Sequence, residues 1–219
     1  MLEAACPLFW LQGYALTTIS EILKRAEVNP GSFYFLFKTK ENLLIAILDH
    51  YSKTLVALVI EPFSLTIADP IERVFAVLEY YRNNLLKTGC TYSCPLGRLA
   101  LEISEEQPRI QNRIATNFDD WTAAIEKCLQ DARPRLPANI DLKALSSFVL
   151  SVMQGGIMQA RTRQSIEPYD ASVKHLRAYF NLLQLAYNQR NNQDGAKACN
   201  HAVIKKNQAP TNTVAATRM

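Results

Sequence analysis

The sequence predicts an all-α protein, and three observations lead to this fold class. In most segments, apolar residues recur every three or four positions, which is typical of helices that bury one face. Preferred N-capping residues, among them Asn29, Asp69 and Asp141, stand directly before such segments. No segment shows the alternation of apolar and polar residues that indicates a strand. We therefore expect eight or nine helices.

The first two predicted helices are short. Residues 2–12 are largely apolar and end at Gly13, a residue type that commonly terminates helices. Because Pro7 is disfavoured inside a helix, we expect that this helix begins near Pro7 or that only its last turn is regular. The second helix should begin with Thr17 or Thr18 as N-cap and last about two turns.

The third helix has the clearest start, because Asn29 is a preferred N-cap and Pro30 fits the first helical position. It should last about two turns. Thr39 then caps a long fourth helix, whose apolar residues recur at helical spacing as far as Ile60. Pro62 should end this helix, since the residue before a proline is disfavoured in helical conformation.

Five further helices are expected in the rest of the chain. Gly155 and Gly156 lie inside the fourth of them, where glycine weakens a helix, so we expect another helix to approach closely there. The five ranges are 69–89, 94–104, 108–129, 141–163 and 168–188. Residues 191–219 have no apolar periodicity and are rich in Asn, Gln, Ala, Thr and Lys, so we expect a disordered tail.

Composition restricts the class of protein. The chain has 219 residues, of which 48% are hydrophobic and 20% charged, as in ordinary globular proteins. Its five cysteines are an odd, scattered set without a signal peptide, so we expect a protein of the reducing cytoplasm. No apolar run approaches the roughly 18 residues that span a bilayer, so we expect no membrane partner.

The second and third helices, joined by a tight turn, form the arrangement that presents a helix to the major groove of DNA. Small residues at the start of the third helix allow close approach to a phosphate, and hydroxyl or ammonium groups can bind phosphates directly. Apolar side chains there, Phe35 and Leu36, favour contact with thymine methyl groups or simply lose hydrogen bonds to the bases. The predicted contacts to double-stranded DNA are Thr17, Thr18, Asn29, Pro30, Gly31, Ser32, Tyr34, Phe35, Lys38 and Lys40.

Residues of this region resemble the DNA-binding domain of the TetR family of transcriptional regulators. That domain commonly reads GY…T…I…A…V…GS(L/F)Y…F…K…L. The matching residues are Gly13, Tyr14, Thr18, Ile19, Ile22, Ala26, Val28, Gly31, Ser32, Phe33, Tyr34, Phe37, Lys40 and Leu43. The resemblance continues at residues 89–114 and 153–163, and it covers roughly residues 1–188.

The resemblance implies a domain organisation and a mode of action. Residues 1–48 would form a helix-turn-helix domain, and residues 49–190 a helical domain for ligand binding and dimerisation. The homodimer would pair through its last two helices, bind a pseudo-palindromic operator as a repressor and leave it when a small-molecule inducer binds. The candidate ligand-binding residues are Tyr81, Cys94, Phe118, Trp121, Phe148 and Met153. Residues 89–114 and 153–163 resemble a branch of the family that includes repressors of stress and detoxification genes. Some members of this branch sense electrophiles or oxidants through a cysteine near Cys94, for which Cys90 could be the resolving partner.

The sequence gives no support to an enzyme, a cofactor or a metal site. Its three histidines are scattered without ligand spacing, and no phosphate-binding loop, catalytic carboxylate pair or nucleophile elbow is present. One alternative remains open. Only four basic residues against five acidic ones precede position 51, and the first helix is shorter than in the family. The chain could therefore be a helical small-molecule-binding or interaction protein that has lost DNA binding.

Overall fold

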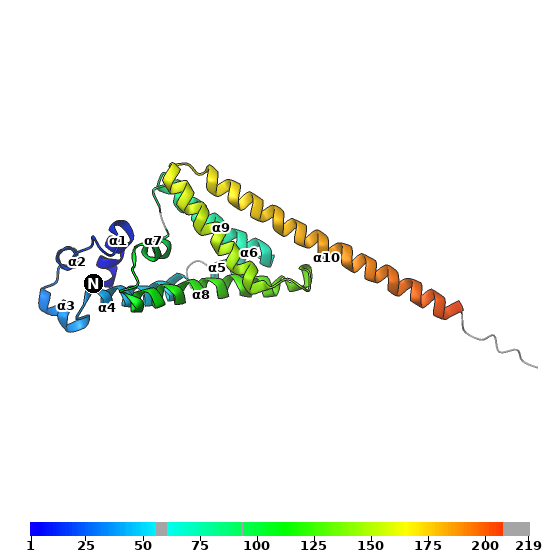
Figure 1. Ribbon diagram of the computed structural model, residues 1–219, viewed down its shortest axis with the longest axis horizontal. Helices are drawn as coiled ribbons and strands as arrows, with labels where there is room; N and C mark the ends of the chain where they lie inside the picture. The colour runs from blue at the N-terminus through cyan, green and yellow to red at the C-terminus, as the bar shows by residue number, and fades with distance from the viewer. Residues whose placement is uncertain (56–60, 93, 208–219) are drawn as a thin grey trace, which may run out of the picture.

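The computed structural model describes residues 1–55, 61–92 and 94–207, with residues 55, 61 and 191–207 as backbone alone. Within these residues it is all-helical, with a short 3₁₀ turn at Arg133–Arg135, and the predicted fold class is confirmed (Figure 1). The α-helices are α1 Leu2–Gln12, α2 Ile19–Ala26, α3 Pro30–Leu36, α4 Lys40–Leu55, α5 Glu61–Thr66, α6 Pro70–Lys87, α7 Pro95–Glu102, α8 Pro108–Asp131, α9 Leu142–Arg163 and α10 Glu167–Asn207.

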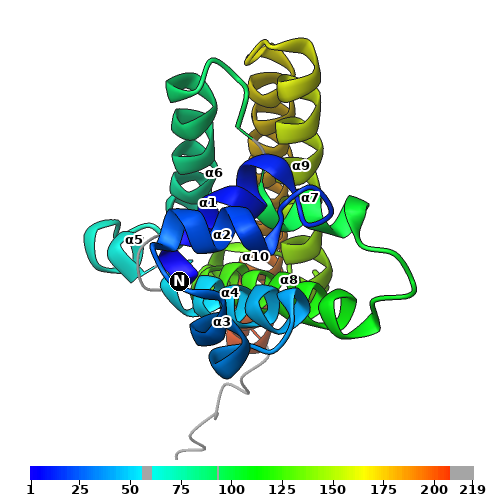
Figure 2. The ribbon, with the colours of Figure 1, turned by 90° about the vertical axis from the view of Figure 1, so that its left-hand side faces the viewer.

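Helices α1 to α3 lie together at one end of the molecule, around the start of α4 (Figures 1 and 2). The predicted caps are present. Thr18 and Glu21 form a capping box at α2, and the Asn29 side chain accepts a 2.9 Å hydrogen bond from the Ser32 N–H at α3. Apolar side chains from all four helices close a small core, made of Phe9, Ile22, Phe33, Leu43 and Leu44, which are fully buried.

The expected start of the first helix near Pro7 is wrong, because α1 runs through Pro7. Proline has no N–H to donate, so the helix loses a backbone hydrogen bond at this position. The side chains of Ala5, Leu8 and Phe9 lie on both sides of Pro7 and are buried. Their burial offsets the lost hydrogen bond, and a short helix therefore forms across a residue that local propensity disfavours.

The long helices α4, α6, α8, α9 and α10 form the larger body. Helix α8 packs against both α4 and α9, and α9 packs against α10 (Figure 1). The close approach that the glycine pair predicts is confirmed at Gly156, where a Cβ atom would lie 3.0 Å from the ring of Tyr169 on α10. The Tyr169 hydroxyl in turn donates a 2.7 Å hydrogen bond to the carbonyl of Leu78 on α6, which ties these helices together.

A short helix that the sequence does not predict, α5, follows α4 in the described part of the chain. Pro62 lies in the first turn of α5, where proline is tolerated, so it begins a helix. The expected extension of the fourth helix to Ile60 falls on residues 56–60, which lie outside the described residues. No helix in the described part of the chain is long and apolar enough to cross a membrane.

The expectation of disorder from residue 191 is wrong for residues 191–207, which continue α10 to Asn207. Figure 1 shows this helix leaving the body as a long arm. Three Ala and three Lys in this segment favour a helix, whereas four Asn and Gly195 disfavour one, and no proline interrupts the chain before Pro210. Missing apolar periodicity shows that a segment has no face to bury, but it does not stop a helix that has already begun. Residues 208–219 lie outside the described residues.

Candidate functional site

Helix α3 presents three large side chains to solvent. Tyr34 is 55% exposed, Phe35 is 85% exposed and Leu36 is 60% exposed, whereas Phe33 on the same helix is fully buried. The Phe33 ring holds the helix in place and meets the Tyr34 ring edge-on at 5.2 Å. Adjacent exposed apolar side chains are costly in water unless a partner covers them. The outer face of α3 is therefore a candidate contact surface.

The polar groups at the start of α3 are arranged around Asn29. Its side-chain oxygen accepts hydrogen bonds from both the N–H and the hydroxyl of Ser32. Pro30 and Gly31 are exposed beside it, and Thr18, also exposed, caps α2. Lys38 follows α3 with its side chain exposed and a left-handed backbone angle φ of 63°. These residues lie on the surface, as a contact to a partner requires.

Two residues of the predicted DNA surface hold the fold from inside. Thr17 is fully buried, and its hydroxyl donates a 2.6 Å hydrogen bond to the Gly13 carbonyl. The Lys40 ammonium donates hydrogen bonds to the carbonyls of Tyr14, at 2.9 Å, and Thr17, at 3.0 Å. It also lies 4.3 Å from the centre of the Tyr14 ring. Burial lowers the pKa of Lys40, against the opposing influence of Glu102.

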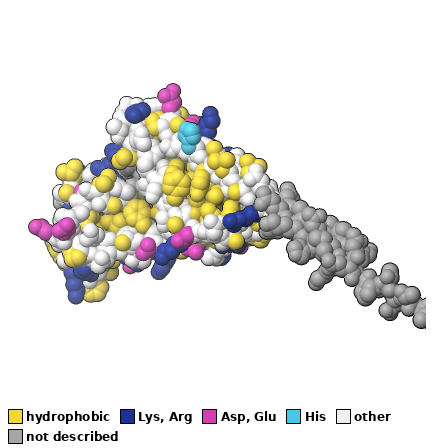
Figure 3. Space-filling model, turned by 45° about the vertical axis from the view of Figure 1, so that its right-hand side comes forward, with side chains coloured by type: hydrophobic (Ala, Val, Ile, Leu, Met, Phe, Trp, Pro, Cys, Tyr) yellow, Lys and Arg dark blue, Asp and Glu magenta, His cyan; other side chains and the backbone are white. Residues whose placement is uncertain are grey.

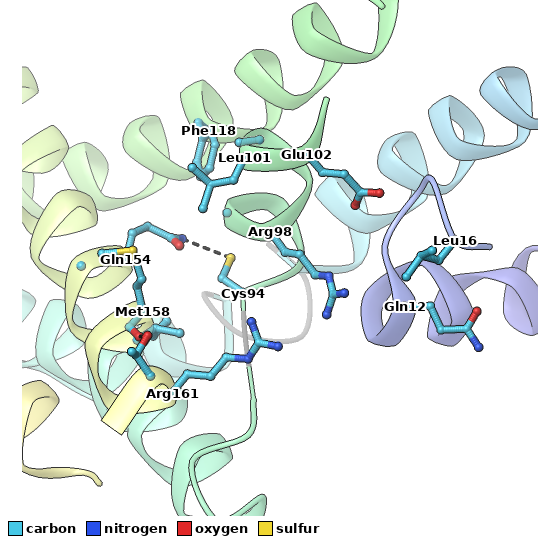
Figure 4. Close-up of a pocket in the computed structure, with 15 residues that line it drawn as sticks. Gln12, Leu16, Cys94, Arg98, Leu101, Glu102, Phe118, Gln154, Met158 and Arg161 are labelled. Atoms are coloured by element: carbon cyan, nitrogen blue, oxygen red, sulfur yellow. Dashed lines mark hydrogen bonds between the residues drawn. The ribbon is translucent and has the colours of Figure 1, made fainter. Parts of the chain in front are cut away.

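A pocket of about 700 Å³ opens between α7, α8 and α9 and extends to the segment that joins α1 to α2 (Figure 4). It is large enough for a drug-sized molecule. Its lining residues come from four parts of the chain and are Gln12, Leu16, Cys94, Gly97, Arg98, Ala100, Leu101, Glu102, Phe118, Gln154, Gly155, Ile157, Met158, Arg161 and Thr162.

The structure brings two of the six predicted ligand-binding residues, Cys94 and Phe118, into this pocket. Tyr81, Trp121 and Met153 are not part of its lining. All three are buried in the core, where the Tyr81 and Trp121 rings lie 5.6 Å apart. Phe148 is 47% exposed on the outer face of α9, with its ring 6.0 Å from that of Tyr179 on α10.

Sequence reasoning missed the polar part of the lining, chiefly Arg98, Glu102, Gln154 and Arg161. A signal was available. On α7 the lining positions 94, 97, 98 and 101 recur at helical spacing, as do positions 154, 157, 158 and 161 on α9. The spacing shows one face for each helix. Only the packing of α7 beside α9 shows that the two faces meet.

Cys94 lies at the N-terminal cap of α7, in the wall of the pocket. Its sulfur accepts a 3.1 Å hydrogen bond from the Gln154 amide nitrogen. Burial raises the pKa of the Cys94 thiol, although hydrogen bonds from Gln154 and the N–H groups of Gly97 and Leu96 oppose the shift. Cys90 is also buried, and both are free thiols. The described residues contain no group of three or more side chains that could hold a metal ion.

The outer face of α9 and α10 is apolar. Figure 3 shows hydrophobic side chains gathered on the face of the body from which α10 emerges. Among the side chains that the structure describes on these two helices, the exposed large hydrophobic ones are Phe148, Met158, Tyr179, Leu182 and Leu185. The family resemblance implies that the last two helices pair in a dimer, and a face of this kind on them is a candidate subunit interface.

Two family models of bacterial transcriptional regulators match parts of this chain. A family model described as "Bacterial regulatory proteins, tetR family" matches residues 1–47. A second, described as "Transcriptional regulator LmrA/YxaF-like, C-terminal domain", matches residues 70–175. The repressor DhaR of Mycobacterium sp. (strain GP1) is 23% identical over 172 residues, which cover 78% of this chain and 85% of DhaR.

Solved structures show the same fold. A TetR regulatory protein from Rhodobacter sphaeroides aligns with a TM-score of 0.72 and 21% identity, over 80% of this chain and 94% of that one. The TetR family regulator CifR, solved with 26-bp double-strand operator DNA, aligns with a TM-score of 0.67 and 22% identity, over 81% of this chain and 94% of CifR. The chain is a DNA-binding transcriptional regulator that belongs to the tetR family of bacterial regulatory proteins.

Proposed function

We propose that the protein is a homodimeric cytoplasmic repressor, which a small molecule releases from a pseudo-palindromic operator by binding the pocket between α7, α8 and α9. The observation that carries this proposal is the composition of the pocket wall. Gln12, the last residue of α1, and Leu16, from the segment between α1 and α2, line the same pocket as residues of α7 and α9. A molecule bound there contacts the ligand domain and the DNA-binding domain at once.

The proposed DNA contacts are the exposed members of the predicted set. In two subunits related by a two-fold axis, α3 would enter successive major grooves, about one helical turn of DNA apart. Thr17 and Lys40 would not contact DNA but would stabilise the helices that do. The residues that would contact DNA are Thr18, Asn29, Pro30, Gly31, Ser32, Tyr34, Phe35 and Lys38.

Release would follow from a shift between two dimer states. A ligand shifts such an equilibrium only if it binds the two states with different affinity. The pocket supplies a basis for the difference, because its wall crosses the boundary between the two domains. Movement of α7 or tilting of α4 would change the distance between the two α3 helices, and the dimer would no longer fit both half-sites.

A gel-shift titration of the full-length protein on the promoter of its own gene tests the DNA half of the proposal. We expect retardation at low salt that disappears on a scrambled fragment of equal length. Absence of retardation by a folded dimer would contradict the proposal and leave a helical small-molecule-binding protein without DNA-binding activity. Addition of a molecule that raises the melting temperature should then reverse the retardation.

A further inference from the structure

Two arginines from different helices extend into the same part of the pocket. Arg98 lies near the start of α7 and Arg161 in the last turn of α9, and Figure 4 shows both side chains extending toward the open side of the pocket. Neither guanidinium has a hydrogen-bond or ion-pair partner among the described residues. By contrast, the structure pairs six other arginines with carboxylates, namely Arg73, Arg82, Arg109, Arg113, Arg135 and Arg177.

Glu102 is the one acidic side chain among the described residues that line the pocket, and it does not neutralise these two cations. Both of its oxygens are engaged elsewhere, since they accept hydrogen bonds from the backbone N–H groups of Tyr14 and Ala15. The lining therefore carries two positive groups against one carboxylate that already has partners. A guanidinium has five donors in a planar fork, which fits a carboxylate, sulfonate or phosphate.

The rest of the pocket suits an apolar molecule. Leu101, Phe118, Ile157 and Met158 present hydrocarbon and aromatic surface to it. Gly97 leaves room on α7 for the side chain of Gln154 on α9, because a Cβ atom at position 97 would lie 2.6 Å from the Gln154 side-chain oxygen. A volume of about 700 Å³ exceeds the space that a small inorganic anion needs.

We propose that this pocket binds an amphipathic anion, with its acidic group held by Arg98 and Arg161. The apolar body of the ligand lies against Leu101, Phe118 and Met158. This inference rests on the proposed function for the consequence of binding, and it adds the chemical class of the inducer. The anion supplies a partner for both guanidinium groups, and an uncharged molecule of the same shape does not.

Direct binding to the full-length protein in the absence of DNA tests the proposal. The probes are benzoate, 2-naphthoate, octanoate and decanoate, each paired with its uncharged primary amide, and calorimetry gives the dissociation constants. We expect at least one carboxylate to bind about tenfold or more tightly than its amide, the contribution of about one charge-assisted hydrogen bond. Naphthalene-2-sulfonate and 2-naphthyl phosphate then show which acidic group the arginines prefer.

Substitutions locate the binding. Arg98→Gln and Arg161→Gln should each weaken the preferred carboxylate about tenfold, and both should leave the affinity for its amide unchanged. Arg163→Gln is the matched control, because Arg163 is an exposed arginine in the same turn of α9 that does not line the pocket. The melting temperature of each free variant confirms that it is folded.

The proposal is overturned if no carboxylate binds more tightly than its amide, or if the double variant of Arg98 and Arg161 binds the preferred carboxylate like the wild type. Failure of the proposed function gives a different result. In that case the carboxylate binds and depends on both arginines, but it does not change the retardation of operator DNA. If the ligand-free protein does not retard operator DNA at all, the proposed function fails, but the calorimetric result for carboxylate binding still stands.

Discussion

Glu102, the last residue of α7, accepts a 2.9 Å hydrogen bond from the backbone N–H of Tyr14, in the segment between α1 and α2. The N–H of Ala15 donates to the other oxygen of the same carboxylate. These hydrogen bonds join the wall of the pocket to the segment that leads into the DNA-binding helices. We therefore expect that movement of α7 would be transmitted to α2 and α3 through these hydrogen bonds as well as through packing.

Gly13 allows the Glu102 carboxylate to approach this segment, and its substitution should push the carboxylate away. A Cβ atom at Gly13 would overlap a Glu102 oxygen, and the backbone angle φ of 89° favours glycine. We expect Gly13→Ala to lower the free energy of unfolding by about 3 kcal/mol, through strain and loss of charge-assisted hydrogen bonds. Urea denaturation followed by tryptophan fluorescence measures the change.

Gly89→Ala is the control for backbone strain alone. Gly89 also has a positive φ, of 58°, but a Cβ atom there would have no neighbour within 4 Å. We expect a cost of about 1 kcal/mol. Equal costs at the two glycines would show that the carboxylate of Glu102 moves away without penalty, and that its hydrogen bonds to the α1–α2 segment contribute little.

Lys38 and Lys40 should respond differently to substitution, although the sequence predicts that both bind phosphate. Lys38 is exposed, so Lys38→Gln should make the slope of log affinity against log salt shallower by about one unit for each phosphate that Lys38 neutralises. Lys40 already donates to the carbonyls of Tyr14 and Thr17, so Lys40→Gln should lower the melting temperature and leave the slope unchanged. Salt titrations of operator binding by the two variants measure these slopes. A shallower slope for Lys40→Gln would contradict the structural role of Lys40.

Phe35 should recognise thymine methyl groups. Its ring is 85% exposed at the outer face of α3 and has no polar atom, so it can read only apolar features in the major groove. Replacing single thymines of the operator by deoxyuridine should weaken binding at the contacted position. Phe35→Ala should weaken binding to the natural operator and remove the sensitivity to deoxyuridine there. If the variant keeps the full sensitivity, another residue contacts the methyl group.

Features that depend on a few neighbouring residues are predicted correctly from the sequence, whereas features that depend on packing are not. Asn29 and Thr18 are recognised as caps because capping depends on the next three residues, and α3 begins as expected. The predictions for the start of α1 and for the end of α10 are wrong. Burial of the neighbouring side chains overrides the effect of Pro7 in the first case, and in the second no proline stops a helix that has already begun. Arg98 and Arg161 belong to one pocket only after α7 packs beside α9, and no spacing within either helix contains that information.

The exposed apolar face of α9 and α10 should hold two subunits together. Leu182 is 62% exposed on α10, and burying a charge in its place would be costly. We expect Leu182→Glu to convert the dimer to a monomer in light scattering coupled to size exclusion, and to abolish operator binding. Leu65→Glu is the control, because Leu65 is 87% exposed on α5, away from this face. A dimer that survives Leu182→Glu would place the interface elsewhere.

Cys94 should react slowly with electrophiles in the ligand-free protein. The thiolate is the nucleophile, and burial raises the pKa of the Cys94 thiol above its usual value, so the thiolate fraction at neutral pH is smaller than for a free cysteine. Its alkylation by iodoacetamide, followed by mass spectrometry, should be slower than that of N-acetylcysteine across the neutral pH range and should still accelerate as pH rises beyond the point where N-acetylcysteine levels off. Cys94→Ser identifies the modified peptide. Faster reaction than the free amino acid would reverse the conclusion and favour electrophile sensing by Cys94, with the Gln154 hydrogen bond as the group that stabilises the thiolate.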